Sequence, residues 1–350
     1  MSSFVNDKIT PVVVSVEDAM DKEMLTKIVA LFPSGPKGRF FRGTHGVTHY
    51  VVEGAAGDPS PSQPKYVVLI HGLGTSLEVY DDLSLSLVAD GFTVIRYDFL
   101  NHGFSIGSGG KCMDLGADVM MTQVKELLDV VCEKDEKVHA FVGHSTGGIV
   151  SILAAHNEEL DGREINQLGL VSPALWADKP LVAQLADKVP GAVSYLLQKG
   201  VPGLSFAIAD AYLKNCDEAF GKNEEGQYIY QEAYEKAKSF NEKLLKDHPN
   251  SVGGIGGANL NMLTGTACTE WRAILTEVAT NGARGRTVNT RLIFGDRDVV
   301  VPFKSPHLDR LKELSNITLV ELPGQGHESL YENSSPIAAT LKKQFERCYD

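Results

Sequence analysis

A single serine, Ser145, stands between two glycines in the segment Gly143-His144-Ser145-Thr146-Gly147. The apolar run 138–142 precedes this segment, and the nearly uncharged run 148–155 follows it. A chain that turns sharply from a strand into a helix, with a hydroxyl held out at the turn, needs small residues on both sides of that hydroxyl. The pattern therefore predicts a nucleophile. The alternative is a glycine-rich turn in which Ser145 only caps the helix.

Partners for such a nucleophile follow later in the chain. An apolar segment that begins at Thr290 leads to Asp296 and Asp298, and another that begins at Ile317 leads to His327. In a parallel sheet the ends of the strands share one edge, so residues far apart in sequence meet there. We expect His327 to act as general base toward Ser145, with an acid that fixes the imidazole tautomer. Of the two acids we favour Asp298, and we expect Asp296 to brace the turn.

A fourth element precedes these residues. The apolar run 66–70 leads into His71-Gly72-Leu73-Gly74-Thr75. Acyl transfer passes through an oxyanion, which needs backbone N–H donors already aimed at it. We expect these donors on Thr146, the residue after the nucleophile, and on Leu73. His71 and His144 lie close to this chemistry in sequence, and we interpret both as structural side chains.

Together these motifs resemble the α/β-hydrolase superfamily, over residues 38–347. Within it they are most similar to the serine esterase and lipase branch that includes monoacylglycerol lipases. A further match is the loop 97–105, in which Asn101 stands where many members have glycine. The resemblance implies an α/β fold, with a mostly parallel central sheet, helices on both faces and a large helical cap inserted after the sixth core strand.

The chain divides into three parts on this interpretation. Residues 1–36 form a helical extension, 37–173 and 287–350 form the hydrolase core, and 174–286 form the cap. The last stretch is far too long for a simple loop. Its apolar segments between 181 and 209 could line an acyl pocket, and the glycine-rich run 251–258 is either a hinge or a closely packed loop.

Local signals predict several elements of the core and the extension. Residues 17–31 have the pattern of an amphipathic helix, and 39–54 that of a hairpin that turns near 43–46. Thr75 and Glu78 have the spacing of a capping box. Ser305 followed by proline predicts another helix start.

Composition narrows the possible partners. The formal net charge is −12 over 350 residues, so nucleic acid is not an expected partner. The five cysteines are widely spaced and suggest reduced thiols in a cytoplasmic protein. We expect no cofactor, no metal and no integral membrane segment, although the cap could contact a lipid surface transiently.

The expected function is hydrolysis of a carboxylic ester with a hydrophobic acyl chain, such as an acylglycerol, through an acyl-enzyme. The same residues would also serve a thioesterase, an amidase or a carbon–carbon bond hydrolase, because the cap and not the triad distinguishes these enzymes. The alternative that is not an enzyme is a non-catalytic ligand receptor with this fold.

Overall fold

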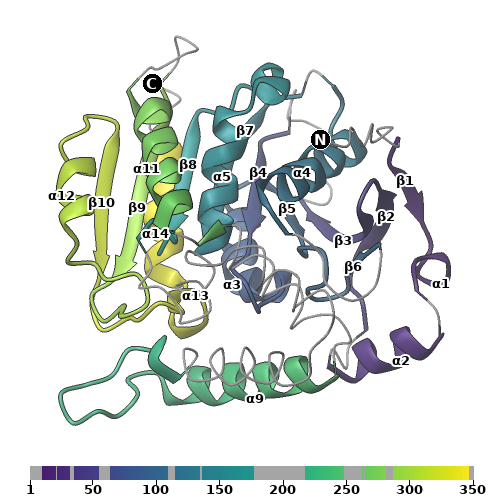
Figure 1. The fold of residues 1–350 in the computed structure, drawn as a ribbon, viewed down its shortest axis with the longest axis horizontal. Helices are drawn as coiled ribbons and strands as arrows, with labels where there is room; N and C mark the ends of the chain where they lie inside the picture. Colours follow the sequence, from purple (N-terminus) through teal and green to yellow (C-terminus); the bar gives the residue numbers. More distant parts are fainter. Residues whose placement is uncertain are drawn as a thin grey trace.

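A single mixed sheet forms the centre of the molecule (Figure 1). The computed structural model describes residues 10–20, 22–31, 35–54, 64–108, 115–134, 136–176, 217–247, 262–263, 265–280 and 287–346. The described strands form one sheet in the order β1-β2-β3-β5-β4-β7-β8-β9-β10, with β6 paired to β3. The strands are β1 (Val12–Val14), β2 (Arg39–Gly43), β3 (Gly46–Glu53), β4 (Tyr66–Ile70), β5 (Thr93–Tyr97), β6 (Ile106–Gly107), β7 (Val138–His144), β8 (Gln167–Val171), β9 (Asn289–Gly295) and β10 (Ile317–Leu322).

The sheet is parallel from β5 to β10 and antiparallel at the β1–β2–β3 side. The predicted hairpin is confirmed, since β2 and β3 pair with Gly43 opposite Gly46. Every residue of β4 is buried, as expected for a central parallel strand covered on both faces. The carboxyl ends of the parallel strands therefore lie along one edge of the sheet.

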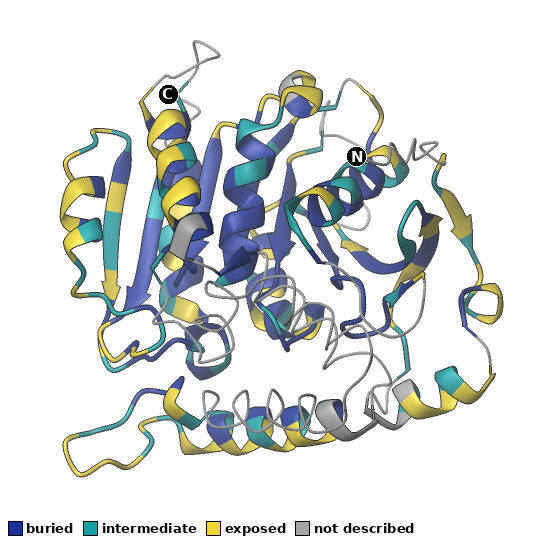
Figure 2. Ribbon diagram, in the orientation of Figure 1, coloured by how far each residue is buried: buried dark blue, intermediate teal, exposed yellow. Residues whose placement is uncertain are grey.

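Helices cover both faces of this sheet (Figures 1 and 2). Alternate residues of β4 enter two separate apolar clusters. Val68 and Ile70 pack with α4 (Ala117–Val131), α5 (Thr146–His156) and α11 (Gly265–Ala279), whereas Val67 and Leu69 pack with α3 (Asp81–Ala89) and α14 (Ser335–Glu346). The α/β-hydrolase architecture expected from the sequence is confirmed in this respect. The helices are α1 (Val16–Ala19), α2 (Lys22–Leu31), η1 (Leu77–Tyr80), α3 (Asp81–Ala89), α4 (Ala117–Val131), α5 (Thr146–His156), η2 (Glu158–Arg163), α9 (Gln231–Asp247), α11 (Gly265–Ala279), α12 (Pro306–Leu311), α13 (Ser329–Glu332) and α14 (Ser335–Glu346).

The N-terminal extension differs from the single helix that its pattern predicts. Two helices form, α1 and α2, because Met20 has extended backbone angles, φ −136° and ψ 143°. Its side chain is buried in an apolar cluster with Phe40 and Leu244. Phe240 of α9 packs against the same cluster. The extension is also not wholly helical, because its β1 pairs with β2 as part of the sheet. It therefore belongs to the sheet and also contacts α9, a helix that follows β8.

The predicted capping box is wrong, whereas the predicted start of α12 is confirmed. The 3-10 helix η1 begins after Ser76, and the Thr75 hydroxyl donates to the carbonyl O of Gly72 at 3.0 Å instead. The Leu77 N–H donates to Asp98, so a residue distant in sequence satisfies the free N–H at this helix start. At α12, Ser305 caps the helix and Pro306 is its first residue.

Two described helices, α9 and α11, lie in the segment between β8 and β9. α11 packs against α5, and its Leu275 is buried in the same apolar cluster as Ile149. α9 lies beyond one edge of the sheet, next to α2 and α13 (Figure 1). The apolar segments between 181 and 209 and the glycine-rich run 251–258 are outside the described residues. Among the described helices, none combines the length and apolarity that crossing a membrane requires.

Candidate active site

Ser145 occupies the tight turn between β7 and α5. Its backbone angles are φ 52° and ψ −118°, a conformation that L-residues adopt rarely and that costs about 1–3 kcal/mol. The flanking glycines are needed because the backbones touch. A Cβ on Gly143 would lie 2.2 Å from the carbonyl O of Gly147, and one on Gly147 would lie 2.1 Å from the carbonyl O of Ile70. The fold therefore holds Ser145 in a strained turn at the edge of the sheet.

The loop after β4 lies against this turn. A Cβ on Gly72 would be 3.1 Å from Cβ of Ser145. The structure thus brings the segment that contains Leu73 beside Ser145 and Thr146, as the sequence predicts. Leu73 is half-buried and Thr146 is buried. The oxyanion role of their N–H groups stays a prediction.

Buried hydrogen bonds fix the shape of that loop. His71 accepts from the Phe99 N–H at 2.9 Å through Nε2, so its Nδ1–H donates to the carbonyl O of Gly72 at 2.6 Å. The Leu77 N–H donates to the Asp98 carboxylate at 2.8 Å. Burial lowers the pKa of His71, which favours the neutral ring that these two bonds require. The structural interpretation of His71 is confirmed.

The loop 97–105 supplies the partners for two of these hydrogen bonds, Asp98 and the Phe99 N–H. Asn101, which stands at a position where many α/β-hydrolases have glycine, has φ 62°. Asparagine tolerates this left-handed conformation better than most residues. Its side-chain oxygen accepts from the Gly107 N–H at 2.9 Å. The substitution therefore preserves the turn.

Asp298 and His327 form a buried pair. Nδ1 of His327 lies 3.0 Å from Oδ2 of Asp298, and the two side chains are 6% and 0% exposed. The other carboxylate oxygen of Asp298 accepts from the N–H groups of Val300 and Val301, at 2.9 and 2.8 Å. These bonds hold the carboxylate toward Nδ1 and leave Nε2 of His327 for another partner.

Asp296 has the bracing role that the sequence suggests for it. Its Oδ1 accepts from the Gly324 N–H at 2.7 Å, which ties the turn after β9 to the turn after β10. His327 follows that second turn, so Asp296 supports the same region without bonding to the imidazole. Asp298 therefore bonds to the His327 imidazole and Asp296 does not, which agrees with the prediction from the sequence.

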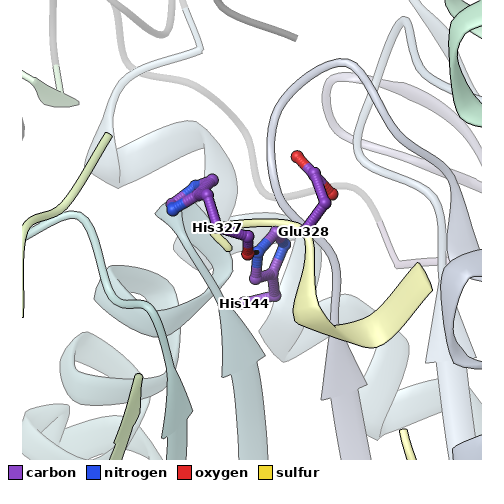
Figure 3. Close-up of side chains that lie close together, drawn as sticks. All are labelled: His144, His327 and Glu328. Carbon is purple, nitrogen blue, oxygen red and sulfur yellow. Dashed lines mark hydrogen bonds between the residues drawn. The ribbon is translucent and has the colours of Figure 1, made fainter. Parts of the chain in front are cut away.

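His144 and Glu328 lie beside His327 (Figure 3). His144 donates its Nε2–H to the carbonyl O of His327 at 2.9 Å, and the two rings are 5.0 Å apart. This bond connects the turn that contains Ser145 to the loop that contains His327. Burial, and next the charge of His327, lower the pKa of His144 to about 3, so its ring is neutral. The interpretation of His144 as a structural side chain is supported.

These three residues are also the one group within the described part of the chain whose ligand atoms could hold a metal ion, since the atoms lie within 4.8 Å of one another. Nδ1 of His144 and Oε2 of Glu328 are buried without a hydrogen-bond partner. A cation bound here would occupy the imidazole of His327. An imidazole that binds a cation cannot also accept a proton as a general base does.

A protein-family model described as "Serine aminopeptidase, S33" matches residues 61–334. The chain belongs to this family of α/β-hydrolases. The match includes β4, the Ser145 turn and both members of the Asp298–His327 pair.

Two individual relatives of this hydrolase are each less than 30% identical to it. It is 28% identical over 288 residues to a non-heme chloroperoxidase of Burkholderia pyrrocinia, an alignment that covers 81% of the chain and 91% of that protein. A monoglyceride lipase homolog of Monkeypox virus is 29% identical, over 48% of the chain and 55% of the relative.

Solved structures share its fold at low identity. A thermophilic esterase from Thermogutta terrifontis has a TM-score of 0.61 at 17% identity, covering 90% of this chain and 96% of that one. The enol-lactonase from Burkholderia xenovorans LB400 has a TM-score of 0.59 at 19% identity, covering 86% and 96%.

The charge distribution of the hydrolase favours the protonated form of His327. Burial alone would lower the pKa of His327, but the charge and hydrogen bond of Asp298, with smaller effects of Glu328 and Glu332, raise it above its ordinary value. The imidazolium therefore stabilises the folded state at pH values below about 6.5, and this contribution is lost as the pH rises through the folded pKa.

We expect the acid limb of the pH–rate profile to follow His327. A general base must be unprotonated, so kcat/KM should rise with pH to a plateau, with a midpoint above about 6.5. Replacing Asp298 by Asn removes the main cause of the raised pKa and should move the midpoint to lower pH. Measuring kcat/KM between pH 5 and 9 checks this; an unchanged midpoint in the variant would exclude Asp298 as the cause.

Two acidic residues of this region were not identified from the sequence. Glu328 follows His327 directly, and burial raises its pKa. Glu332 lies four residues later, where burial raises its pKa to about 7 although two backbone N–H groups lower it. The sequence shows only two acids in a short, mainly polar segment after the histidine, and acids in such a segment usually face solvent.

Proposed function

We propose that this protein is a serine hydrolase that cleaves carboxylic esters through an acyl-enzyme. The observation that carries the proposal is the buried Asp298–His327 pair, with Nδ1 held by the carboxylate at 3.0 Å. Family membership and the strained turn at Ser145 support it. One relative is named a monoglyceride lipase homolog, and two solved structures with the same fold are named an esterase and an enol-lactonase; these names favour an ester as substrate.

In the first half of the proposed reaction, Oγ of Ser145 attacks the ester carbonyl carbon while Nε2 of His327 takes the hydroxyl proton. The N–H groups of Leu73 and Thr146 donate to the oxyanion that forms. Asp298 stabilises the imidazolium and stays ionised. The bond to the leaving alcohol then breaks, and His327 returns the proton to the alcohol oxygen.

The second half releases the acyl group. Water gives a proton to His327 and attacks the acyl carbon, and the acyl–Ser145 bond breaks as the imidazolium protonates the serine oxygen. The sequence of steps consumes one water and yields one acid and one alcohol, with no cofactor. We propose that the segment 174–286 forms a cap over the acyl chain of an acylglycerol or a similar hydrophobic ester.

A substrate panel tests this assignment. We expect p-nitrophenyl esters to be hydrolysed with kcat/KM that increases from acetate to a medium-length acyl chain, because a longer chain buries more apolar surface. Matched thioesters and an aminoacyl p-nitroanilide, included because of the family's aminopeptidase description, should react more slowly. Faster cleavage of the thioester or the anilide would replace the ester assignment by a thioesterase or a peptidase.

A further inference from the structure

The carboxylate of Glu332 joins two separate segments of the chain. Its Oε1 accepts from the Gly221 N–H at 2.5 Å, and its Oε2 accepts from the Gly326 N–H at 2.7 Å. Gly221 lies between β8 and β9, within the segment that precedes α9, and Gly326 is the residue before His327. Glu332 itself is only 8% exposed. One buried carboxylate thus accepts a hydrogen bond from the backbone of each of the two segments.

The two segments also meet directly, backbone against backbone. The His327 N–H donates to the carbonyl O of Ala219 at 2.6 Å. A Cβ on Gly326 would lie 2.3 Å from that same oxygen, and one on Gly221 would lie 2.3 Å from the carbonyl O of Gly324. A side chain at either glycine would push these two backbone segments apart. The backbone position of His327 therefore depends on residues 219–221.

Apolar packing reinforces the contact. Phe220 is buried with Tyr234 and Ala237, the latter two on α9, and Val300 and Tyr331 pack against this cluster. Val300 is also one of the two residues whose N–H groups hold the Asp298 carboxylate. The described residues from 219 to 237 thus touch both the loop of Asp298 and the helix that follows His327.

We propose that Glu332 is a positioning residue, which fixes the backbone of His327 against residues 219–221 and thereby keeps the imidazole aligned. Charge-assisted hydrogen bonds to backbone N–H groups are stronger than neutral ones. Removing the buried carboxylate leaves two donors unpaired, which costs more than the bonds themselves contribute. The structural part of this proposal stands on the contacts alone, and its effect on turnover rests on the proposed function.

Hydrogen–deuterium exchange tests the structural part without any substrate. At pH 8 the carboxylate of Glu332, with a pKa of about 7, is mostly ionised. We expect Glu332→Ala to accelerate exchange about tenfold or more in two peptides together, one covering residues 219–222 and the other 324–328. Glu332→Gln should lie between, because an amide oxygen can accept only one of the two N–H groups. The matched control is Glu321→Gln on the exposed part of β10, which should change neither peptide.

Labelling kinetics test the catalytic part. The second-order rate of fluorophosphonate labelling should decrease in the order wild type, Glu332→Gln, Glu332→Ala, with the last about tenfold slower. The pH midpoint of labelling in Glu332→Gln should move to lower values, because the charge of Glu332 raises the pKa of His327. A purely structural role for Glu332 would leave that midpoint unchanged.

The outcomes separate the two proposals. Unchanged exchange in both peptides of folded Glu332→Ala and Glu332→Gln overturns the role of Glu332, whatever the labelling rates are. Coupled exchange without a change of labelling rate or midpoint overturns the positioning of His327. A wild-type protein that is never labelled contradicts the proposed function, while the exchange experiment still decides the contact.

Discussion

Replacing Ser145 by alanine is expected to lower ester hydrolysis by about 10⁶-fold, the size of effect that loss of the nucleophile produces in the serine protease subtilisin. The Ser145 hydroxyl is the group that would form the acyl-enzyme, and the variant removes it without changing the glycines that shape the turn. Steady-state kcat on the best p-nitrophenyl ester measures the loss.

A denaturant-unfolding measurement tests whether the Ser145→Ala variant is folded. Because φ at position 145 is 52°, alanine keeps the backbone strain whereas glycine relieves it. We expect Ser145→Gly to be more stable than Ser145→Ala by about 1 kcal/mol in denaturant unfolding. A Ser145→Ala protein that unfolds normally and retains more than about one hundredth of wild-type kcat would rule out Ser145 as the nucleophile.

The second large effect is expected at Asp298. Asp298→Asn should decrease kcat by about 10⁴-fold, because an amide in place of the carboxylate favours the wrong tautomer of the His327 imidazole. In this structure Oδ2 of Asp298 faces Nδ1 of His327 at 3.0 Å, while Oδ1 is held by two backbone N–H groups. An asparagine would keep its oxygen on those N–H groups and turn its NH₂ toward the imidazole.

Asp296→Asn is the matched control for that experiment. Its carboxylate accepts one hydrogen bond, from the Gly324 N–H, and does not bond to His327. An asparagine oxygen can accept the same bond, so kcat should fall by less than about tenfold. If Asp296→Asn lost more activity than Asp298→Asn, the assignment of the acid would be wrong.

Much of the fold and of the candidate site follows from local patterns. The strands β4, β7 and β9 coincide with apolar runs because a central parallel strand is buried on both faces and needs no polar side. β10 also coincides with an apolar run, although it is the edge strand of the sheet and only its end residues Ile317 and Leu322 are buried. Ser145, Asp298 and His327 are recognisable because each follows such a run. The glycines beside Ser145 are recognisable too, since a backbone contact leaves no room for a side chain.

Other features depend on contacts between distant parts of the chain, and the local pattern misleads there. Thr75 and Glu78 have capping-box spacing, but Asp98 supplies the acceptor for η1 from the neighbouring loop. The helix expected over 17–31 is interrupted at Met20 because its side chain is buried against Phe40 and Leu244.

Glu332 is the clearest case of a residue hidden from sequence reasoning. An acid in a polar stretch normally faces solvent, and only the approach of Gly221 from another part of the chain encloses this one. Burial then raises its pKa to about 7. Nothing in the residues around position 332 indicates this partner, because the partner lies more than one hundred residues earlier.

Labelling with a fluorophosphonate probe tests the central claim most directly. The probe reacts with an activated serine and leaves a phosphonyl group on its oxygen. We predict that intact-mass analysis shows one adduct per chain, that peptide mapping places it on Ser145, and that Ser145→Ala and His327→Ala abolish it. A folded wild-type protein that takes up no probe, or that carries the adduct on another serine, would contradict the account.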